Sequence, residues 1–305
     1  MTENDMTIGP LPRMTPKIVG AMRVHALLDS VGPTRKPVEM LRDVPDAIVD
    51  QHKDWLVPNY VAPDTGLMIM AYQSFLIELG GKVILVDCAV GEDGNFPARP
   101  DWHLGKSDWL NHLGQAGHPP EDIDTVFLTH LHLDHTGWLT RKTKDGWVPS
   151  FPKARHVTSA TELEFWPKKH EEFPYMASSI PDSVTPVIEA GLFAPIAPET
   201  EIATDLFVVD LAGHSPGMIG LEYRQDGQVL AAFNADLMHS PVQMAAPGCA
   251  TMFCADPAAA VATRRDKLAQ YAKDKTLMFC NHFPGECAGH AVPRGDGYMF
   301  VPVTG

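Results

Sequence analysis

The stretch TVFLTHLHLDH at residues 125–135 decides the fold of this chain. Its first half is mostly apolar and β-branched, which is typical of a strand that is buried on both faces. Its second half places four potential metal ligands within six residues: His130, His132, Asp134 and His135. In an extended chain His130 and His132 point to the same side and can bind one ion, and a turn at Asp134 would aim the last two side chains at a second point. The stretch therefore predicts a site for two metal ions at the end of a buried strand.

Three further potential ligands follow later strands. His214 follows LFVVDL in the turn GHSPG, Asp236 ends the strand VLAAFNAD, and His282 ends the strand that begins with TLMFC. Each lies where a strand passes into a loop, as His130 does, so a folded sheet could bring them together. Imidazole and carboxylate ligands suit zinc, but iron, cobalt, nickel and manganese accept them too. A carboxylate can bridge two ions and a neutral imidazole cannot, so Asp236 is the candidate bridging ligand.

Sequence patterns on either side of this stretch indicate more of the sheet. SFLIELGGKVILVDC at 74–88 predicts a hairpin, because paired glycines accept the positive φ of a tight turn. LFVVDL, MIGLEYR and VLAAFNAD predict three more strands, and TLMFC at 276–280 predicts another. Between them, Asp256 as N-cap and Pro257 at the first helical position predict a helix that ends near Lys273. The core sheet is therefore expected to begin near the hairpin.

Two segments are harder to assign from their pattern. Residues 1–65 are rich in proline and charge, and KIVGAMRVHALL at 17–28 could form one early strand. Residues 138–200 have no dominant period, so we interpret them as an elaborated loop region with short helices. The aromatic side chains of this second segment either line a substrate pocket or pack its loops onto the domain.

The composition narrows the class of protein. A chain of 305 residues with 45% apolar and 20% charged residues can bury a substantial core. Its net charge of −14, from 38 acidic and 24 basic residues, would repel the phosphate backbone of nucleic acid. We therefore expect no nucleic-acid partner.

The N-terminal sequence and the number of cysteines indicate the cellular compartment. MTENDMTIGPLPRMTPK lacks the apolar core of a secretory signal, and no stretch approaches the roughly 18 apolar residues of a membrane-spanning helix. Five cysteines, an odd number, do not suggest a secreted disulfide framework. We therefore expect a soluble, cytoplasmic protein without a membrane partner.

The motifs HxHxDH, GHSPG, the aspartate of NAD and then NHF follow one another in an order and spacing that resemble the metallo-β-lactamase superfamily. The resemblance covers roughly residues 70–290. It implies a four-layer αββα sandwich of the α/β class, formed by a single metallohydrolase domain at 66–305 with an insertion at about 138–200. Residues 1–65 would then be an N-terminal extension packed on that domain.

The same resemblance assigns the ligands of two divalent ions, with zinc the first choice for both. His130, His132 and His214 would bind the first ion, whereas Asp134, His135 and His282 would bind the second, with Asp236 bridging them. Asp87, in the strand LVDC, matches an aspartate that supports the site from behind.

The chemistry of such a site is hydrolysis. Two cations that share a water lower its pKa from about 15.7 toward roughly 7, so a metal-bound hydroxide can attack an ester-like bond at neutral pH. Asp134 is a candidate proton shuttle, and Asp236 would act as the bridging ligand. His239 is a candidate catalytic residue near the substrate, although packing explains this histidine equally well.

The residues after the bridging aspartate narrow the substrate. Acyl-homoserine lactonases of this fold have a tyrosine three residues after that aspartate, whereas this chain has His239. The run from Asp236 to Gln243 is similar instead to the D-x-x-H-x-x-x-Q stretch of the methyl parathion hydrolase-like branch. Members of that branch cleave esters, some lactones and, in special cases, phosphotriesters. We therefore expect an esterase or lactonase for a small, fairly apolar substrate.

Other functions are alternatives to this one. A phosphotriesterase and an acyl-homoserine lactonase are the nearest. A nuclease of the same superfamily would need a basic surface, and a flavodiiron-type oxidoreductase would need a flavin-binding domain for which about 20 residues after His282 leave no room. A non-catalytic metal-binding protein would not need the complete set of seven candidate ligands. The chain could also form a homodimer.

Overall fold

The first sheet contains the hairpin that the sequence predicted. In the computed structural model, which describes residues 15–304, β4 (Ile69–Leu79) turns at Gly80 and Gly81 into β5 (Lys82–Val86). Both glycines have positive φ, 58° and 75°, a conformation that glycine adopts readily because it has no Cβ atom. The prediction of a tight hairpin at 74–88 is confirmed.

This first sheet has seven strands in the order β1-β2-β4-β5-β6-β9-β10. The strands β5, β6, β9 and β10 are mutually parallel, so their carboxyl ends lie at one edge of the sheet. The remaining bounds are β1 (Lys17–Val19), β2 (Met22–Pro33), β6 (Thr125–Phe127), β9 (Arg155–Thr158) and β10 (Phe193–Pro195).

The segment 17–28, expected to give one early strand, gives parts of two. β1 and β2 form a hairpin, and β2 pairs antiparallel with β4 over ten residue pairs. Met22, Val24 and Leu27 of β2 are buried in the core, which explains why this segment belongs to the sheet. This part of the expected extension at 1–65 is thus built into the first sheet instead of being packed on its outside. The first 14 residues of that extension lie outside the described residues.

The second sheet also has seven strands, in the order β11-β12-β13-β14-β16-β17-β18. The strands predicted from LFVVDL, MIGLEYR, VLAAFNAD and TLMFC are β12, β13, β14 and β16, and β14 and β16 run parallel to each other. The bounds are β11 (Glu201–Ala203), β12 (Leu206–Asp210), β13 (Ile219–Gln225), β14 (Gln228–Phe233), β16 (Leu277–Phe279), β17 (Ala288–Arg294) and β18 (Gly297–Pro302).

Aromatic side chains join the two sheets across the core. The ring of Phe75, on β4, lies 5.6 Å from the rings of Phe233 and Phe279 on the second sheet. Phe233 and Phe279 stack on each other with their centroids 4.7 Å apart. All three side chains are buried, so their contact contributes both apolar burial and favourable ring geometry.

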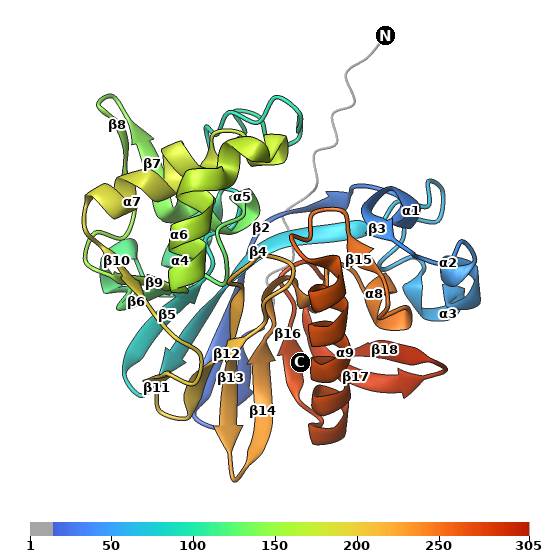
Figure 1. Ribbon diagram of the computed structural model, residues 1–305. Coiled ribbons are helices and arrows are strands. Elements are labelled where there is room, and N and C mark those ends of the chain that lie inside the picture. Colours follow the sequence, from blue (N-terminus) through green and yellow to red (C-terminus); the bar gives the residue numbers. More distant parts are fainter. Residues whose placement is uncertain (1–14, 305) are drawn as a thin grey trace.

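Helices cover the outer faces of the sheets. α9 (Pro257–Asp274) packs on β14 and β17, and α4 (Trp109–Gln115) packs on β2 (Figure 1). α9 begins as predicted, because the Asp256 side chain accepts a hydrogen bond from the Ala259 N–H at 2.9 Å. The four layers confirm the α/β sandwich that the resemblance implied.

The region 138–200 holds more regular structure than the sequence indicated. It supplies β9 and β10 to the first sheet, and it contains the hairpin of β7 (Thr140–Thr143) and β8 (Gly146–Pro149). It also contains the helices α6 (Ala160–Lys169) and α7 (Thr185–Glu189), and α7 packs against β8 (Figure 1). The expectation of a loop region with short helices was therefore only partly right.

The remaining elements are short. They are α1 (Pro37–Met40), α2 (Ile48–Gln51), α3 (Lys53–Leu56), α5 (Leu133–Thr136) and α8 (Val242–Ala245), with β3 (Leu41–Arg42) paired to β15 (Ala250–Thr251). Within residues 15–304 no helix combines the length and apolar character needed to cross a membrane.

Candidate metal centre

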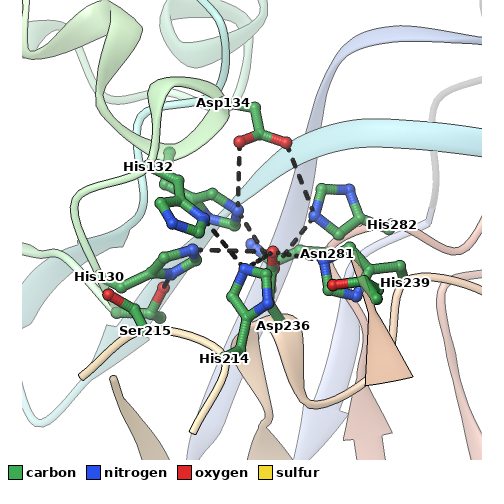
Figure 2. Close-up of polar contacts among 12 residues, drawn as sticks. His130, His132, Asp134, His214, Ser215, Asp236, His239, Asn281 and His282 are labelled. Carbon is green, nitrogen blue, oxygen red and sulfur yellow. Dashed lines mark hydrogen bonds and ion pairs between the residues drawn. The ribbon is translucent and has the colours of Figure 1, made fainter. Parts of the chain in front are cut away.

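Seven side chains from both sheets converge where strands pass into loops (Figure 2). His130 and His132 lie in the loop after β6, and α5 carries Asp134 and His135. The second sheet supplies the others, from the loops after β12, β14 and β16: His214, Asp236 and His282. The structure therefore brings together all seven ligands that the sequence predicted.

The first group consists of His130, His132, His214 and Asp236, whose ligand atoms lie within 4.8 Å of one another. His214 Nε2 is 3.0 Å from His132 Nδ1 and 3.2 Å from Asp236 Oδ2. His130 Nε2 is 3.7 Å from the same carboxylate oxygen. Oδ2 of Asp236 therefore faces the imidazoles of His130 and His214.

The second group consists of Asp134, His135 and His282, again within 4.8 Å. His282 Nε2 is 3.8 Å and His135 Nε2 is 3.9 Å from the Asp134 carboxylate. The other oxygen of Asp236, Oδ1, lies 3.1 Å from His135 Nε2 and 3.0 Å from His282 Nε2. Asp236 thus presents one oxygen to each group, which is the arrangement a bridging carboxylate requires.

The chemistry of this cluster fits two divalent cations. His130 Nε2 and His135 Nε2 are buried and make no hydrogen bond within the described residues. Buried polar atoms are normally paired, so unpaired nitrogens that point at a shared carboxylate indicate positions that a cation would fill. Imidazole and carboxylate donors suit divalent first-row metals. The site is a dinuclear centre for divalent metal ions.

Burial and neighbouring charge set the protonation of the cluster. Burial lowers the pKa of His130 and of His132 well below the usual value, which favours the neutral imidazole that binds a cation. Burial alone would raise the pKa of Asp236, but the imidazoles of His135 and His282 outweigh it and hold that pKa well below its usual range. Asp236 is therefore an ionised carboxylate inside the protein.

His239 adds an eighth polar side chain to the centre. Its Nε2 lies 3.0 Å from Asp236 Oδ2, and its ring stacks on that of His282 with an interplanar angle of 10°. It also lines the cavity above the ligands. The backbone N–H of His239 donates to Gln243 Oε1 at 2.8 Å, so the histidine and glutamine of the D-x-x-H-x-x-x-Q run contact each other.

Hydrogen bonds behind the ligands fix their rings. The Nδ1–H of His135 donates to Asp87 Oδ2 at 2.8 Å, and Asn281 Nδ2 donates to the same oxygen at 3.0 Å. The Nδ1–H of His282 donates to the Ala71 carbonyl at 3.0 Å. Asp87 therefore contacts His135, a candidate ligand, on the side of the ring away from Asp236.

Glu162 is a buried carboxylate near the site that the sequence reasoning did not single out. It accepts hydrogen bonds from Leu131 N at 3.0 Å, Ser215 Oγ at 2.6 Å and Gly217 N at 2.7 Å. The sequence pattern around Glu162 predicts a different role, because Ser159 followed three residues later by Glu162 is typical of a capping box at a helix start on the protein surface. Ser159 does accept from Glu162 N, but the carboxylate itself points into the core.

A cavity of about 640 Å³ opens over the ligands. Six aromatic side chains are part of its lining: Tyr72, Phe96, Trp102, Phe173, Tyr175 and Phe253. Two of these, Phe173 and Tyr175, come from the 138–200 region, whereas Trp138, Phe151 and Trp166 of that region are fully buried packing residues. Some aromatic side chains of this region therefore line the cavity, whereas others pack its loops onto the domain.

Comparison with known proteins gives consistent matches. The sequence matches the metallo-beta-lactamase superfamily over residues 70–231, more than half of the chain. It is 24% identical over 200 residues to the N-acyl homoserine lactonase AiiB of Agrobacterium fabrum, covering 61% of this chain and 69% of the relative.

Two solved structures share the whole fold. The hydrolase AbOPH of the beta-lactamase superfamily superimposes with a TM-score of 0.77 at 26% identity, covering 97% of this chain and 98% of the other. AidC, a dizinc quorum-quenching lactonase solved with a product, gives a TM-score of 0.76 at 22% identity over 96% and 98% of the two chains.

Proposed function

The chain belongs to the metallo-beta-lactamase superfamily, and from this premise we propose that it hydrolyses ester or lactone bonds of small, largely apolar substrates at a dinuclear zinc centre. The observation that carries the proposal is Asp236, whose two oxygens face two separate ligand groups on the floor of an aromatic cavity. Such a carboxylate would hold two cations in one site, where they would supply an activated water and polarise the bond to be broken.

The roles of the side chains follow from their positions. When bound, the two cations supply an activated water and polarise the scissile carbonyl. Asp134 lines the cavity and its side chain is 15% exposed, so it can exchange a proton with the reacting groups and with solvent. Asp236 is fixed on both oxygens and serves as a ligand. His239 lines the cavity beside Asp236, where it would contact the substrate.

The cavity supports an apolar acyl or alkyl group beside the reacting carbonyl. Its volume of about 640 Å³ suits a small organic molecule, and its aromatic lining favours burial of apolar surface. Lactones are the first class to test, because AiiB and AidC are lactonases. The cytoplasmic location stays a prediction, and a cytoplasmic substrate would suit it. The homodimer also stays a prediction.

A phosphotriester substrate is a second candidate. The hydrogen bond between His239 N and Gln243 Oε1 shows that the two marked residues of the D-x-x-H-x-x-x-Q run form one local unit. That run is similar to a stretch found in the methyl parathion hydrolase-like branch. The tetrahedral phosphoryl centre of a phosphotriester substrate would bind at the same two cations.

The test combines metal content with a substrate panel. Wild type, His132→Ala and His118→Ala would be assayed with γ- and δ-lactones, an acyl-homoserine lactone, p-nitrophenyl butyrate and methyl paraoxon. His118 pairs with Glu78 away from the cluster, so its variant is the matched control. We expect about two metal ions per wild-type chain and a loss of kcat/KM of at least about 100-fold only in His132→Ala.

The preferred substrate would choose between lactonase, esterase and phosphotriesterase. A wild-type protein that binds no divalent metal, or turnover that His132→Ala leaves unchanged, would refute the proposed function.

A further inference from the structure

We propose that Glu162 is a positioning residue that joins the two loops carrying the histidines of the first metal ion. Its carboxylate lies between the HLHLDH loop and the GHSPG loop and accepts hydrogen bonds from both. Neither loop belongs to α6, the helix that carries Glu162. The Glu162 side chain therefore links the two loops from a separate helix and fixes the distance between the loops.

The two carboxylate oxygens divide their partners between the loops. Oε2 accepts from Leu131 N, and Leu131 stands between His130 and His132 in the chain. Oε1 accepts from Ser215 Oγ and Gly217 N, and Ser215 directly follows His214. Each of these three histidines is thus one residue away from a group that Glu162 holds. The histidines assigned to the second ion have hydrogen-bond partners other than Glu162: His135 donates to Asp87 and His282 to the Ala71 carbonyl. Asp87 also accepts from Thr129, whose hydroxyl lies 3.0 Å from His130 Nδ1.

The neighbours of Glu162 complete this arrangement. Trp166 Nε1 donates to Ser215 Oγ at 2.9 Å, which leaves the Ser215 hydroxyl proton free to point at Glu162. The ring of Trp166 lies 4.9 Å from that of His132, at an angle of 72°. One face of α6 therefore contacts ligand residues or their immediate neighbours on both loops.

The cost of burial supports a specific purpose for this carboxylate. Glu162 is 0% exposed, and none of its hydrogen-bond partners among residues 15–304 is a basic side chain. A carboxylate that is buried among neutral donors loses much of its hydration energy, so packing alone would favour an apolar residue here. Fixing two loops through charge-assisted hydrogen bonds explains its presence.

Loss of this carboxylate should selectively lower the affinity of the first site for its metal ion. Glu162→Gln keeps the size of the side chain but replaces one accepting oxygen with an NH₂ group, which would face an N–H or O–H donor of one loop. The inference rests on the proposed dinuclear centre. We expect the zinc affinity of the first site to fall by about 10- to 100-fold, and that of the second to stay within about threefold of wild type.

The experiment is equilibrium competition for zinc between the metal-free protein and a chromophoric chelator, which yields both dissociation constants. His282→Ala marks the constant that belongs to the second ion. Glu164→Gln is the matched control, because Glu164 lies on the same helix with a 77% exposed side chain paired to Lys168. The melting temperature of each metal-free variant would be measured alongside.

Ser215→Ala is the second variant, in case Glu162→Gln does not fold. It removes only the Ser215 hydroxyl from the carboxylate, and we expect a smaller loss at the first site, of about 3- to 10-fold. Wild-type-like zinc affinities in the folded variants, with or without a lower metal-free melting temperature, would overturn the role of Glu162. A wild-type protein that binds no zinc would instead refute the proposed function on which the inference rests.

Discussion

Asp236 is the residue on which the centre depends most. Its side chain is buried, and its oxygens lie within 3.0 to 3.2 Å of nitrogens from His135, His214, His239 and His282. Burial would raise its pKa, but the nearby imidazoles, above all those of His135 and His282, outweigh burial and hold the pKa well below its usual range. The bridging role proposed for Asp236 thus rests on a single buried carboxylate that both candidate ligand groups share.

Asp87→Asn tests whether a single carboxylate oxygen behind His135 is needed for metal binding. Asp87 has φ of 60°, a conformation that asparagine tolerates, so the change adds little backbone strain. Its new NH₂ group would replace an oxygen that accepts from Thr129 N or from His135 Nδ1. We expect the zinc affinity of the second site to fall by about 10- to 100-fold, as measured by chelator competition.

Asp124→Asn provides the control for that change. Asp124 accepts from Val83 N at 2.9 Å, and its side chain is 39% exposed. Its variant should bind zinc as wild type does. An Asp87→Asn protein whose second-site affinity equals that of Asp124→Asn would show that the carboxylate is not needed to hold the ligand.

At the scale of elements, the short helix α5 is placed by a close backbone contact. A Cβ atom on Gly137, which follows α5, would lie 1.8 Å from the Val90 carbonyl oxygen in the loop after β5. Only glycine fits, because the obstacle is backbone and cannot move aside. The backbone N–H of Cys88 also donates to the His135 carbonyl at 2.8 Å. The loop after β5 therefore fixes the helix that carries Asp134 and His135.

Gly137→Ala should disturb both the fold and the second ion. Forcing a methyl group into this contact is expected to lower the free energy of unfolding by about 1–3 kcal/mol. It should also displace α5, and with it the carboxylate of Asp134. Urea unfolding of the metal-free protein and zinc competition would measure the two effects.

Gly114→Ala is the matched control for Gly137→Ala. Gly114 lies in α4, and nothing is within 4 Å of a Cβ atom built there. Replacing a helical glycine with alanine should raise stability by about 0.5–1 kcal/mol. Equal unfolding free energies for the two alanine variants would show that the contact with Val90 is not tight.

At the scale of the whole molecule, the two sheets meet at the metal centre. The first sheet supplies His130, His132, Asp134 and His135 through β6 and α5, and the second supplies His214, Asp236 and His282. Bound cations would therefore cross-link the two halves of the sandwich. They would also offset part of a net charge of −14.

Metal removal should consequently destabilise the entire chain. A ligand that binds only the folded state adds about 2.7 kcal/mol per site when its concentration is 100 times its Kd. We expect the melting temperature to fall after dialysis against a chelator and to recover when zinc is added. Magnesium at the same concentration is the control, because it prefers all-oxygen sites. Identical melting curves with and without zinc would contradict this cross-linking role.

The sequence alone determined the features that short stretches of chain specify. The order of HxHxDH, GHSPG, NAD and NHF predicted the family, and the family match confirms it. Runs of apolar and β-branched residues predicted β4, β5, β12, β13, β14 and β16, because each run and its flanking turn residues lie within a few positions of one another. The sequence also predicted the candidate metal ligands, since four of these residues lie within six positions.

Only the tertiary structure decided features that depend on distant parts of the chain. Glu162 reaches Leu131 across 31 positions and Ser215 across 53, so no local pattern could reveal its contacts. The same holds for β2, whose place in the first sheet comes from pairing with β4 about 45 residues later. Sequence spacing records which chemical groups are available, whereas packing between remote segments decides which of them meet.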